Sequence, residues 1–111
     1  MYIVTNTVHL QPGNADMFVE RFNREGKVET MPGFVGLEVM LTENTKDYEE
    51  ITIVTRWEDT TGFKGWMKSR EFKDAHAHRG GIPEFIIKNK TTYYQVKLRR
   101  KPRIETESSV G

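Results

Sequence analysis

The strand-like and helix-like segments of this chain follow one another in the order β-α-β-β-α-β. Residues rich in β-branched and alternating apolar side chains predict strands in four segments, 2–10, 34–42, 49–57 and 91–98. Apolar residues recur at helical spacing after Asn14, a candidate cap, and again after Asp59, with Ser69 as a fresh cap inside the second helical region. This order predicts an α+β, ferredoxin-like fold, in which both helical segments lie on one face of an antiparallel sheet.

The chain has 111 residues, which suits a single domain. We expect this domain to span residues 1–100 and a polar, flexible tail to span residues 101–111. No apolar run approaches the ~20 residues that cross a bilayer, and no leader peptide is visible. There is no cysteine for a disulfide, a zinc–thiolate site or an iron–sulfur cluster, and a net charge of +1 does not favour nucleic-acid binding. We therefore expect a cytoplasmic protein that binds neither nucleic acid nor membrane.

Aromatic residues make up 11% of a chain in which 36% of residues are hydrophobic. They can fill the core, cover a subunit interface or hold a large flat ligand, and composition does not choose among these. The sheet face away from the helices also needs cover, because it is expected to carry Ile3, Thr5 and either Tyr93 or Tyr94. An isologous homodimer that packs two such sheets together would cover both copies.

One polar residue, Asn6, interrupts the apolar strand face that it shares with Tyr2, Val4 and Val8. Its structural interpretation is an irregular ladder or a hydrogen bond to a helix end, and its functional interpretation is a polar donor inside an apolar pocket. Trp66 is expected on the helix side that faces the sheet, either as a core residue or as the wall of a large pocket.

Three histidines, His9, His76 and His78, are the candidate metal ligands. His76 and His78 are two residues apart, so they cannot share a helical face and a paired site is not expected. His76 joins the apolar stripe of the second helical region, beside a Gly-Gly loop, where a single imidazole can be the axial ligand of a metal-bound cofactor. His9 ends the first strand on the face opposite Asn6, so we expect it in solvent or at an interface.

Together these residues describe a cavity between sheet and helices that holds one amide and one imidazole. Its expected lining is Val4, Val8, Phe22, Trp66 and either Ile53 or Val54. The sequence has no nucleophile–histidine–acid set, no paired carboxylates with a site around them and no phosphate-binding glycine loop. Hydrolysis and phosphoryl transfer are therefore not indicated.

Several stretches point to one family. They are residues 3–7 (IVTNT), 31–39 (MPGFVGLEV), 55–58 (TRWE), 63–66 (FKGW) and 69–76 (SREFKDAH). On these stretches the chain from residue 2 to 98 resembles the IsdG-type heme-degrading monooxygenases of the antibiotic-biosynthesis-monooxygenase superfamily, and within it the HmoA-like members. The combination of Asn6, Trp66 and His76 is the more specific part, because these positions match the family's catalytic set.

The resemblance implies a heme oxygenase that binds heme as both substrate and cofactor. It would open the porphyrin with O₂ to a bilin-type product and release iron for iron acquisition. The resemblance implies His76 as the iron ligand, Trp66 as the side chain that distorts the macrocycle, and Asn6 as the donor toward bound dioxygen or a pyrrole nitrogen. Phe22 is expected to contact the heme with them.

The same resemblance implies two partners. One is a second copy of the chain, in a homodimer whose two sheets form a β-barrel. The other is an external electron-donating reductase, because the chain has no flavin or nicotinamide fingerprint of its own.

Two other functions stay open. A cofactor-free, quinone-forming monooxygenase of the same superfamily, acting on an aromatic polyketide, needs no iron ligand, so His76 distinguishes it. A heme carrier or sensor keeps His76 but has no need of Trp66 or Asn6.

Overall fold

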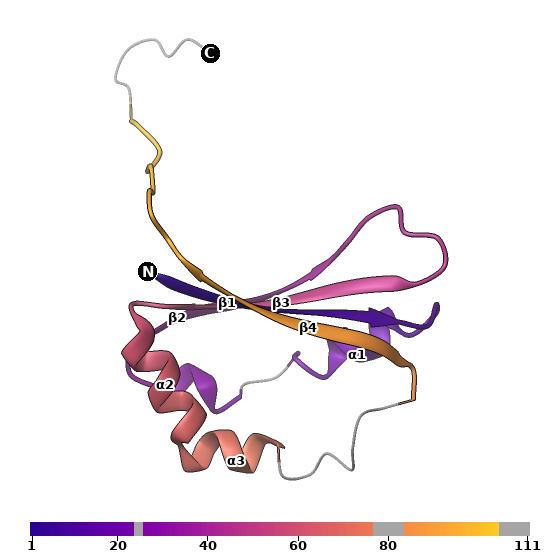
Figure 1. The fold of residues 1–111 in the computed structure, drawn as a ribbon, viewed down its shortest axis with the longest axis horizontal. Coiled ribbons are helices and arrows are strands. Elements are labelled where there is room, and N and C mark those ends of the chain that lie inside the picture. Colours follow the sequence, from indigo (N-terminus) through magenta and orange to yellow (C-terminus); the bar gives the residue numbers. More distant parts are fainter. Residues whose placement is uncertain (24–25, 77–83, 105–111) are drawn as a thin grey trace.

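The computed structural model describes residues 1–23, 26–76 and 84–104 of the chain. Its strands form one four-stranded antiparallel sheet in the order β2-β3-β1-β4, with bounds β1 (Tyr2–Leu10), β2 (Phe34–Leu41), β3 (Glu49–Trp57) and β4 (Ile86–Gln95). The helices are α1 (Ala15–Glu20), α2 (Thr60–Lys68) and α3 (Arg70–His76), together with a short 3₁₀ turn, η1 (Val28–Thr30). All of them lie on one face of the sheet (Figure 1). The predicted ferredoxin-like α+β fold is confirmed.

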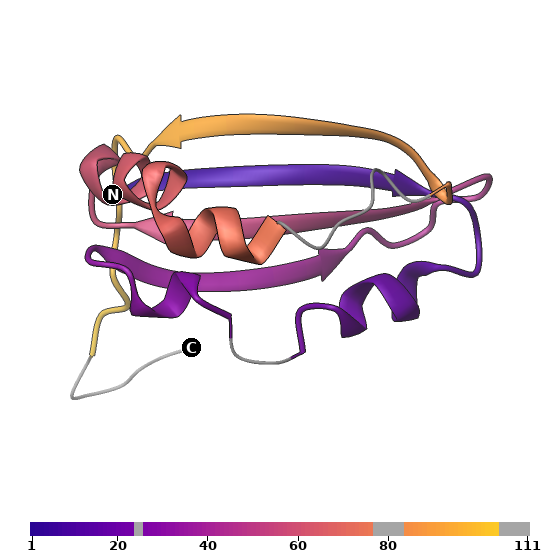
Figure 2. The same cartoon turned by 90° about the horizontal axis from the view of Figure 1, so that it is seen from below.

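The helix-side face of the sheet carries two apolar clusters, one near each end. Figure 2 shows α1 toward one end of the sheet and α2 with α3 toward the other. The first, which we call the α1 cluster, is built on Val8, Leu10, Ala15, Phe18 and Ile51. The second, the α2 cluster, is built on Val4, Val28 and Trp57. Burying a valine, leucine, isoleucine or phenylalanine side chain stabilises a fold by about 1.5–3 kcal/mol, so the two clusters hold the helices at separate places.

Strand pairing fixes which residues share a face. β1 lies between β3 and β4, and direct partners in an antiparallel pair point to the same side. Val4, Asn6 and Val8 face the helices, as predicted, whereas His9 lies on the other face, which we call the open face. Val54 lies on the open face between its strand partners Thr5 and Glu38 and is 4% exposed.

Local hydrogen bonds explain where the helices begin. The Asp59 carboxylate accepts from the backbone N–H groups of Thr61 (2.9 Å) and Gly62 (3.3 Å) and so caps α2. Ser69 separates α2 from α3, which confirms the predicted break. Asn14 stands at the N-cap position of α1, but its side chain does not cap the helix. The N–H groups of Asn14 and Ala15 donate instead to Glu49 Oε1, at 2.9 and 3.0 Å.

The last strand differs most from the prediction. β4 runs from Ile86 to Gln95, whereas the sequence pattern placed it at residues 91–98. Its first half was missed because β4 is an edge strand whose exposed stretch Lys88–Asn89–Lys90 has no apolar alternation. The other bounds differ less: α1 ends at Glu20, β2 ends at Leu41, and η1 was not predicted.

After β4, residues 96–104 form neither helix nor strand and leave the sheet on its open-face side (Figure 1). The predicted glycine loop at residues 80–83 lies outside the described residues. Within the described ranges, no helix combines the length and the apolar character that a membrane-spanning helix needs.

Candidate functional site

Asn6 is a half-buried residue whose side-chain oxygen is buried. It lies in the middle of β1, directly opposite Ile53 on β3 and Thr91 on β4. Its Oδ1 atom is buried and has no hydrogen-bond partner among the residues that the structure describes. An unsatisfied buried polar atom typically costs about 1–3 kcal/mol, and Asn6 Oδ1 shares this state with Nε1 of the core residue Trp57.

The α2 cluster and the α1 cluster flank Asn6 along β1. Val4 precedes it on the same strand face and belongs to the α2 cluster, against which Trp66 packs. Val8 follows it and belongs to the α1 cluster, against which Phe22 packs. Asn6 therefore lies between the cluster that holds Trp66 and the cluster that holds Phe22. The structure thus places these three predicted residues on one side of the sheet.

Trp66 is held at the corner between α2 and α3. Its ring meets Phe72 edge to face, with centroids 5.3 Å apart and an interplanar angle of 88°. Ser69 Oγ donates to the Trp66 carbonyl at 2.7 Å and accepts from the Phe72 N–H at 3.0 Å. One hydroxyl therefore links the last turn of α2 to the first turn of α3. The indole is half-buried rather than sealed in the core.

His76 is the last residue of α3, one turn after Phe72, and its side chain lies outside the described residues. Phe22 follows α1 and meets Phe18 edge to face at 5.6 Å. Of the two alternatives for the cavity lining, Ile53 faces the helices with Asn6, whereas Val54 belongs to the open face. The sequence could not choose between them because strand register is not visible in it.

Tyr93 is an aromatic residue whose face of the sheet the sequence left open. The pattern did not tell which of Tyr93 and Tyr94 faces the helices. The β1–β4 register pairs Tyr93 with Val4 and Tyr94 with Ile3, so Tyr93 lies on the helix side. Its ring stacks on Tyr2 and meets Phe63 of α2.

A polar network occupies the open face around His9. His9 Nε2 donates to Glu50 Oε1 at 2.7 Å, and the imidazole stacks on Tyr48 with centroids 4.3 Å apart. The Thr42 hydroxyl donates to Glu50 Oε2 at 2.6 Å. Hydrogen bonds from Thr42, which has the larger effect, and from His9 lower the pKa of the Glu50 carboxyl below its ordinary value. This network lies across the sheet from Asn6, so it is not part of the same site.

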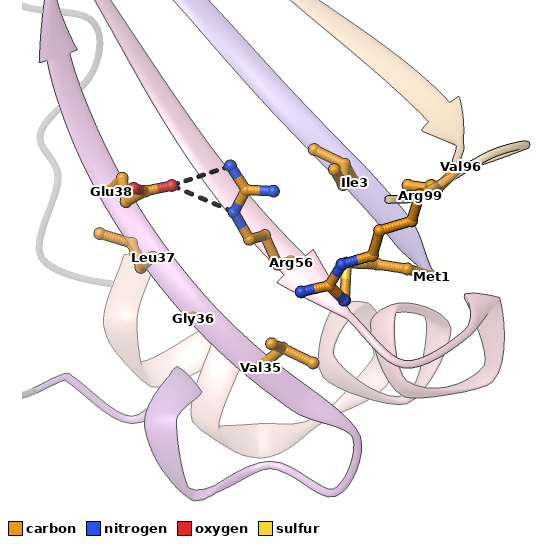
Figure 3. Close-up of a pocket in the computed structure, with 9 residues that line it drawn as sticks. All are labelled: Met1, Ile3, Val35, Gly36, Leu37, Glu38, Arg56, Val96 and Arg99. Carbon is orange, nitrogen blue, oxygen red and sulfur yellow. Dashed lines mark hydrogen bonds and ion pairs between the residues drawn. The ribbon is translucent and has the colours of Figure 1, made fainter. Parts of the chain in front are cut away.

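The open face also has a hollow of about 500 Å³ near the end of β4 (Figure 3). Arg56 and Glu38 form an ion pair on its wall, with Nη2 3.0 Å and Nε 3.1 Å from Glu38 Oε1. Its remaining lining residues are Met1, Ile3, Val35, Gly36, Leu37, Val96 and Arg99. Across the described residues, no three His, Asp or Glu side chains come close enough to hold a metal ion.

Comparison with known proteins shows the family to which the chain belongs. Residues 1–78 match the family described as antibiotic biosynthesis monooxygenase. Proteins of Bacillus cereus (strain B4264) and Bacillus mycoides (strain KBAB4), both named heme-degrading monooxygenase, are 60% and 58% identical to this chain over 102 residues. Each of these matches covers 92% of this chain and 95% of the relative.

Solved structures have the same fold. A Bacillus cereus crystal structure assigned to the antibiotic biosynthesis monooxygenases superposes with a TM-score of 0.81 at 30% identity, and the match covers 91% of this chain and 97% of that one. MhuD, a heme-degrader of Mycobacterium tuberculosis with two hemes bound in its active site, superposes with a TM-score of 0.69 at 25% identity, covering 91% of this chain and all of MhuD. With the family match over residues 1–78 and relatives at 60% identity, the chain belongs to the antibiotic biosynthesis monooxygenase family.

Proposed function

We propose that this protein is a heme-degrading monooxygenase. It binds heme as substrate, opens the porphyrin ring with O₂ and electrons from an external reductant, and releases a bilin-type product and iron. The released iron would contribute to the iron supply of the cell. The relatives named heme-degrading monooxygenase, at 60% identity, support the choice of substrate. So does MhuD, whose structure holds heme on the same fold.

The observation that carries this proposal is the unpaired Oδ1 of Asn6, buried between the Trp66 cluster and the Phe22 cluster. Heme has a wide apolar ring and a small polar centre. A site for it needs apolar and aromatic walls together with very few polar atoms aimed at that centre. The residues around Asn6 fit this requirement. Its neighbours on the sheet face are Val4, Val8, Ile53 and one hydroxyl residue, Thr91, and the aromatic walls come from α2 and from the turn after α1.

Each site residue has a separate task. His76, at the end of α3, is the imidazole that would bind the iron. Trp66 would contact the macrocycle from the α2 side and favour its distortion, and Phe22 would pack against it from the α1 side. Asn6 would present its Nδ2–H group as the polar donor within the site and its buried Oδ1 as an acceptor. When bound, the heme iron supplies the activation of O₂.

We also propose that the protein is a cytoplasmic homodimer formed through the open faces, whose paired sheets form a barrel. The open face exposes Met40 and Tyr94, which are 48% and 49% exposed, and Leu98 of the following segment, which is 81% exposed. An isologous contact would cover these side chains on both copies. The proposed domain spans residues 1–100, with residues 101–111 as its tail, and we propose no nucleic-acid or membrane partner.

Titration with hemin, followed by reduction, tests this function. The pure protein should give a Soret band with equimolar hemin, and that band should decay when ascorbate is added with catalase present to remove hydrogen peroxide. His76→Ala should lose turnover. Asn6→Ala should still bind hemin but fail to degrade it.

Each alternative function has its own outcome. Absence of a Soret band contradicts heme binding and favours a quinone-forming monooxygenase that acts on an aromatic substrate. A stable Soret band that never decays favours a carrier or sensor. Wild-type degradation by His76→Ala would show that His76 is not the required ligand.

A further inference from the structure

Tyr93 lies beside the predicted heme site but outside the set of residues assigned to it. Thr91 of β4 pairs with Asn6, and Tyr93, the next residue on that strand face, pairs with Val4. Diagonal neighbours on one sheet face are within reach of an aromatic side chain. Because β4 is the edge strand, Tyr93 marks the margin of the helix-side face next to Asn6.

The Tyr93 ring is fixed in place although it is exposed. It stacks on Tyr2 with centroids 6.4 Å apart and an interplanar angle of 20°, and it meets Phe63 at 5.9 Å and 62°. Phe63 lies on α2, one turn before Trp66, and both pack against the α2 cluster. Tyr93 therefore joins, through Phe63, the aromatic residues that pack against the α2 cluster with Trp66, at the edge of the sheet.

More than half of Tyr93 is nevertheless exposed, 55%, on the face that the helices cover elsewhere. No hydrogen bond of its hydroxyl group is present within the part of the chain that the structure describes. An aromatic ring held by two neighbours, with a free phenol, is pre-organised to bind, because little side-chain freedom remains to be lost.

We propose that Tyr93 binds the edge of the flat ligand, with its phenol O–H donating to an anionic substituent of that ligand. This inference rests on the proposed function, in which the ligand is heme and the anionic substituents are its carboxylates. A phenol donates a charge-assisted hydrogen bond to a carboxylate, which is stronger than a bond to a neutral acceptor. Tyr93 thus selects porphyrins that carry free carboxylates.

Two tyrosines on one strand offer a matched experiment. Tyr93→Phe removes the hydroxyl and keeps the ring contacts with Tyr2 and Phe63. Tyr94→Phe removes the same group from the opposite face, where Tyr94 pairs with Ile3. Each variant, and the parent, is titrated with hemin and with hemin dimethyl ester, and binding is followed by the Soret absorbance. Thermal melts establish that the variants are folded.

Tyr93→Phe should bind hemin about tenfold more weakly than the parent, the low end of what a hydrogen bond to a charged group contributes. Its affinity for the dimethyl ester should change much less, and Tyr94→Phe should match the parent with both ligands. Unchanged hemin affinity in Tyr93→Phe overturns the inference, and so does an equal loss with both ligands. Failure of the parent to bind hemin at all overturns the proposed function itself, so the two failures are distinguishable.

Discussion

His9 and Glu50 face each other across the β1–β3 pair, and His9 Nε2 donates to Glu50 Oε1 at 2.7 Å. The other carboxylate oxygen of Glu50 accepts from the Thr42 hydroxyl at 2.6 Å. Thr42 lies just beyond β2, so the Glu50 carboxylate connects three parts of the sheet's hairpin end. The Tyr48 ring lies flat against the imidazole and partly shields the pair from water.

The Glu50 network predicts how stability changes in acid. Thr42, and then His9, lower the pKa of Glu50 from its ordinary value of 4.5. A carboxyl with a lowered pKa in the folded state stabilises the fold above its unfolded pKa, and that contribution is lost as the pH falls through the folded pKa. Glu50→Gln should therefore lose less stability than the parent between about pH 5 and pH 3, with a difference of about 1 kcal/mol or less.

Urea unfolding at a series of pH values measures this difference. Glu43→Gln, in the exposed hairpin loop, corrects for the general effect of removing one negative charge. Thr42→Val should change the pH dependence of the free energy of unfolding in the same direction as Glu50→Gln, because it removes the hydrogen bond that lowers the pKa of Glu50 most. If the free energy of unfolding changed equally with pH in the parent and in Glu50→Gln, the Glu50 network would not contribute to acid sensitivity.

Two glycines of α2 should respond oppositely to the same substitution. A Cβ on Gly62 would lie 2.9 Å from the Pro32 carbonyl oxygen and 3.1 Å from Trp57 Cε3, where α2 begins against the sheet. A Cβ on Gly65 would meet nothing within 4 Å. Gly62→Ala should destabilise the fold by about 1–3 kcal/mol through overpacking, whereas Gly65→Ala should be neutral or stabilise it by up to about 1 kcal/mol through helix propensity.

Denaturant melts of both variants compare them directly. A similar loss of stability in both variants would mean that α2 needs glycine for backbone flexibility, and not because Gly62 lies close to Trp57. If Gly62→Ala were more stable than the parent, α2 would be able to move away from Pro32 without cost.

The sequence predicted the parts of this fold that depend on local pattern. β3 was predicted at its observed bounds because Ile51, Ile53 and Val54 lie in a long β-branched run. The α2–α3 break was found because Ser69 can cap a helix locally. The first half of β4 was missed, because an edge strand needs no apolar alternation, and its pairing with β1 is a contact between chain ends.

Candidate residues were easier to find than their surroundings. Asn6 was visible as one amide in an apolar strand face, and Trp66 as an aromatic on a helix that faces the sheet. The cap that Glu49 provides for α1 was not visible, because it joins residues 34 and 35 positions apart. The roles of Tyr93 and Ile53 also depend on strand register, which tertiary pairing decides.

Ser69 should position the site rather than take part in its chemistry. Its hydroxyl donates to the Trp66 carbonyl and accepts from the Phe72 N–H, so it sets the angle between α2 and α3. Ser69→Ala should cost about 1 kcal/mol of stability, the usual effect of losing a helix cap. Because α3 carries His76, hemin affinity should fall as well.

Ser69→Thr is the matched control, since threonine keeps the hydroxyl and caps nearly as well. It should retain both the stability and the hemin affinity that Ser69→Ala loses, as measured by thermal melts and Soret titration. Reduced stability in Ser69→Ala with unchanged hemin affinity would assign the hydroxyl to the fold alone.

Replacing Asn6 should raise the stability of the fold but abolish hemin degradation. Its buried Oδ1 lacks a partner, and asparagine is disfavoured in the middle of a strand. Asn6→Val removes the unsatisfied atom and adds a β-branched side chain beside Val4 and Val8, so the free energy of unfolding should rise by about 1 kcal/mol. The same variant should bind hemin but lose its reductive degradation, because the site has lost its amide.

Thr5→Val serves as the control, because it adds a valine to the same strand on the open face. It should leave hemin degradation unchanged. The free energy of unfolding comes from urea melts and the degradation from the decay of the Soret band with ascorbate. A less stable Asn6→Val would mean that the amide is satisfied in the folded protein, so its burial could be explained by the fold. A more stable variant that still degrades hemin would remove Asn6 from the mechanism. Higher stability with lost turnover would mean that the strand keeps a destabilising residue for the sake of the site.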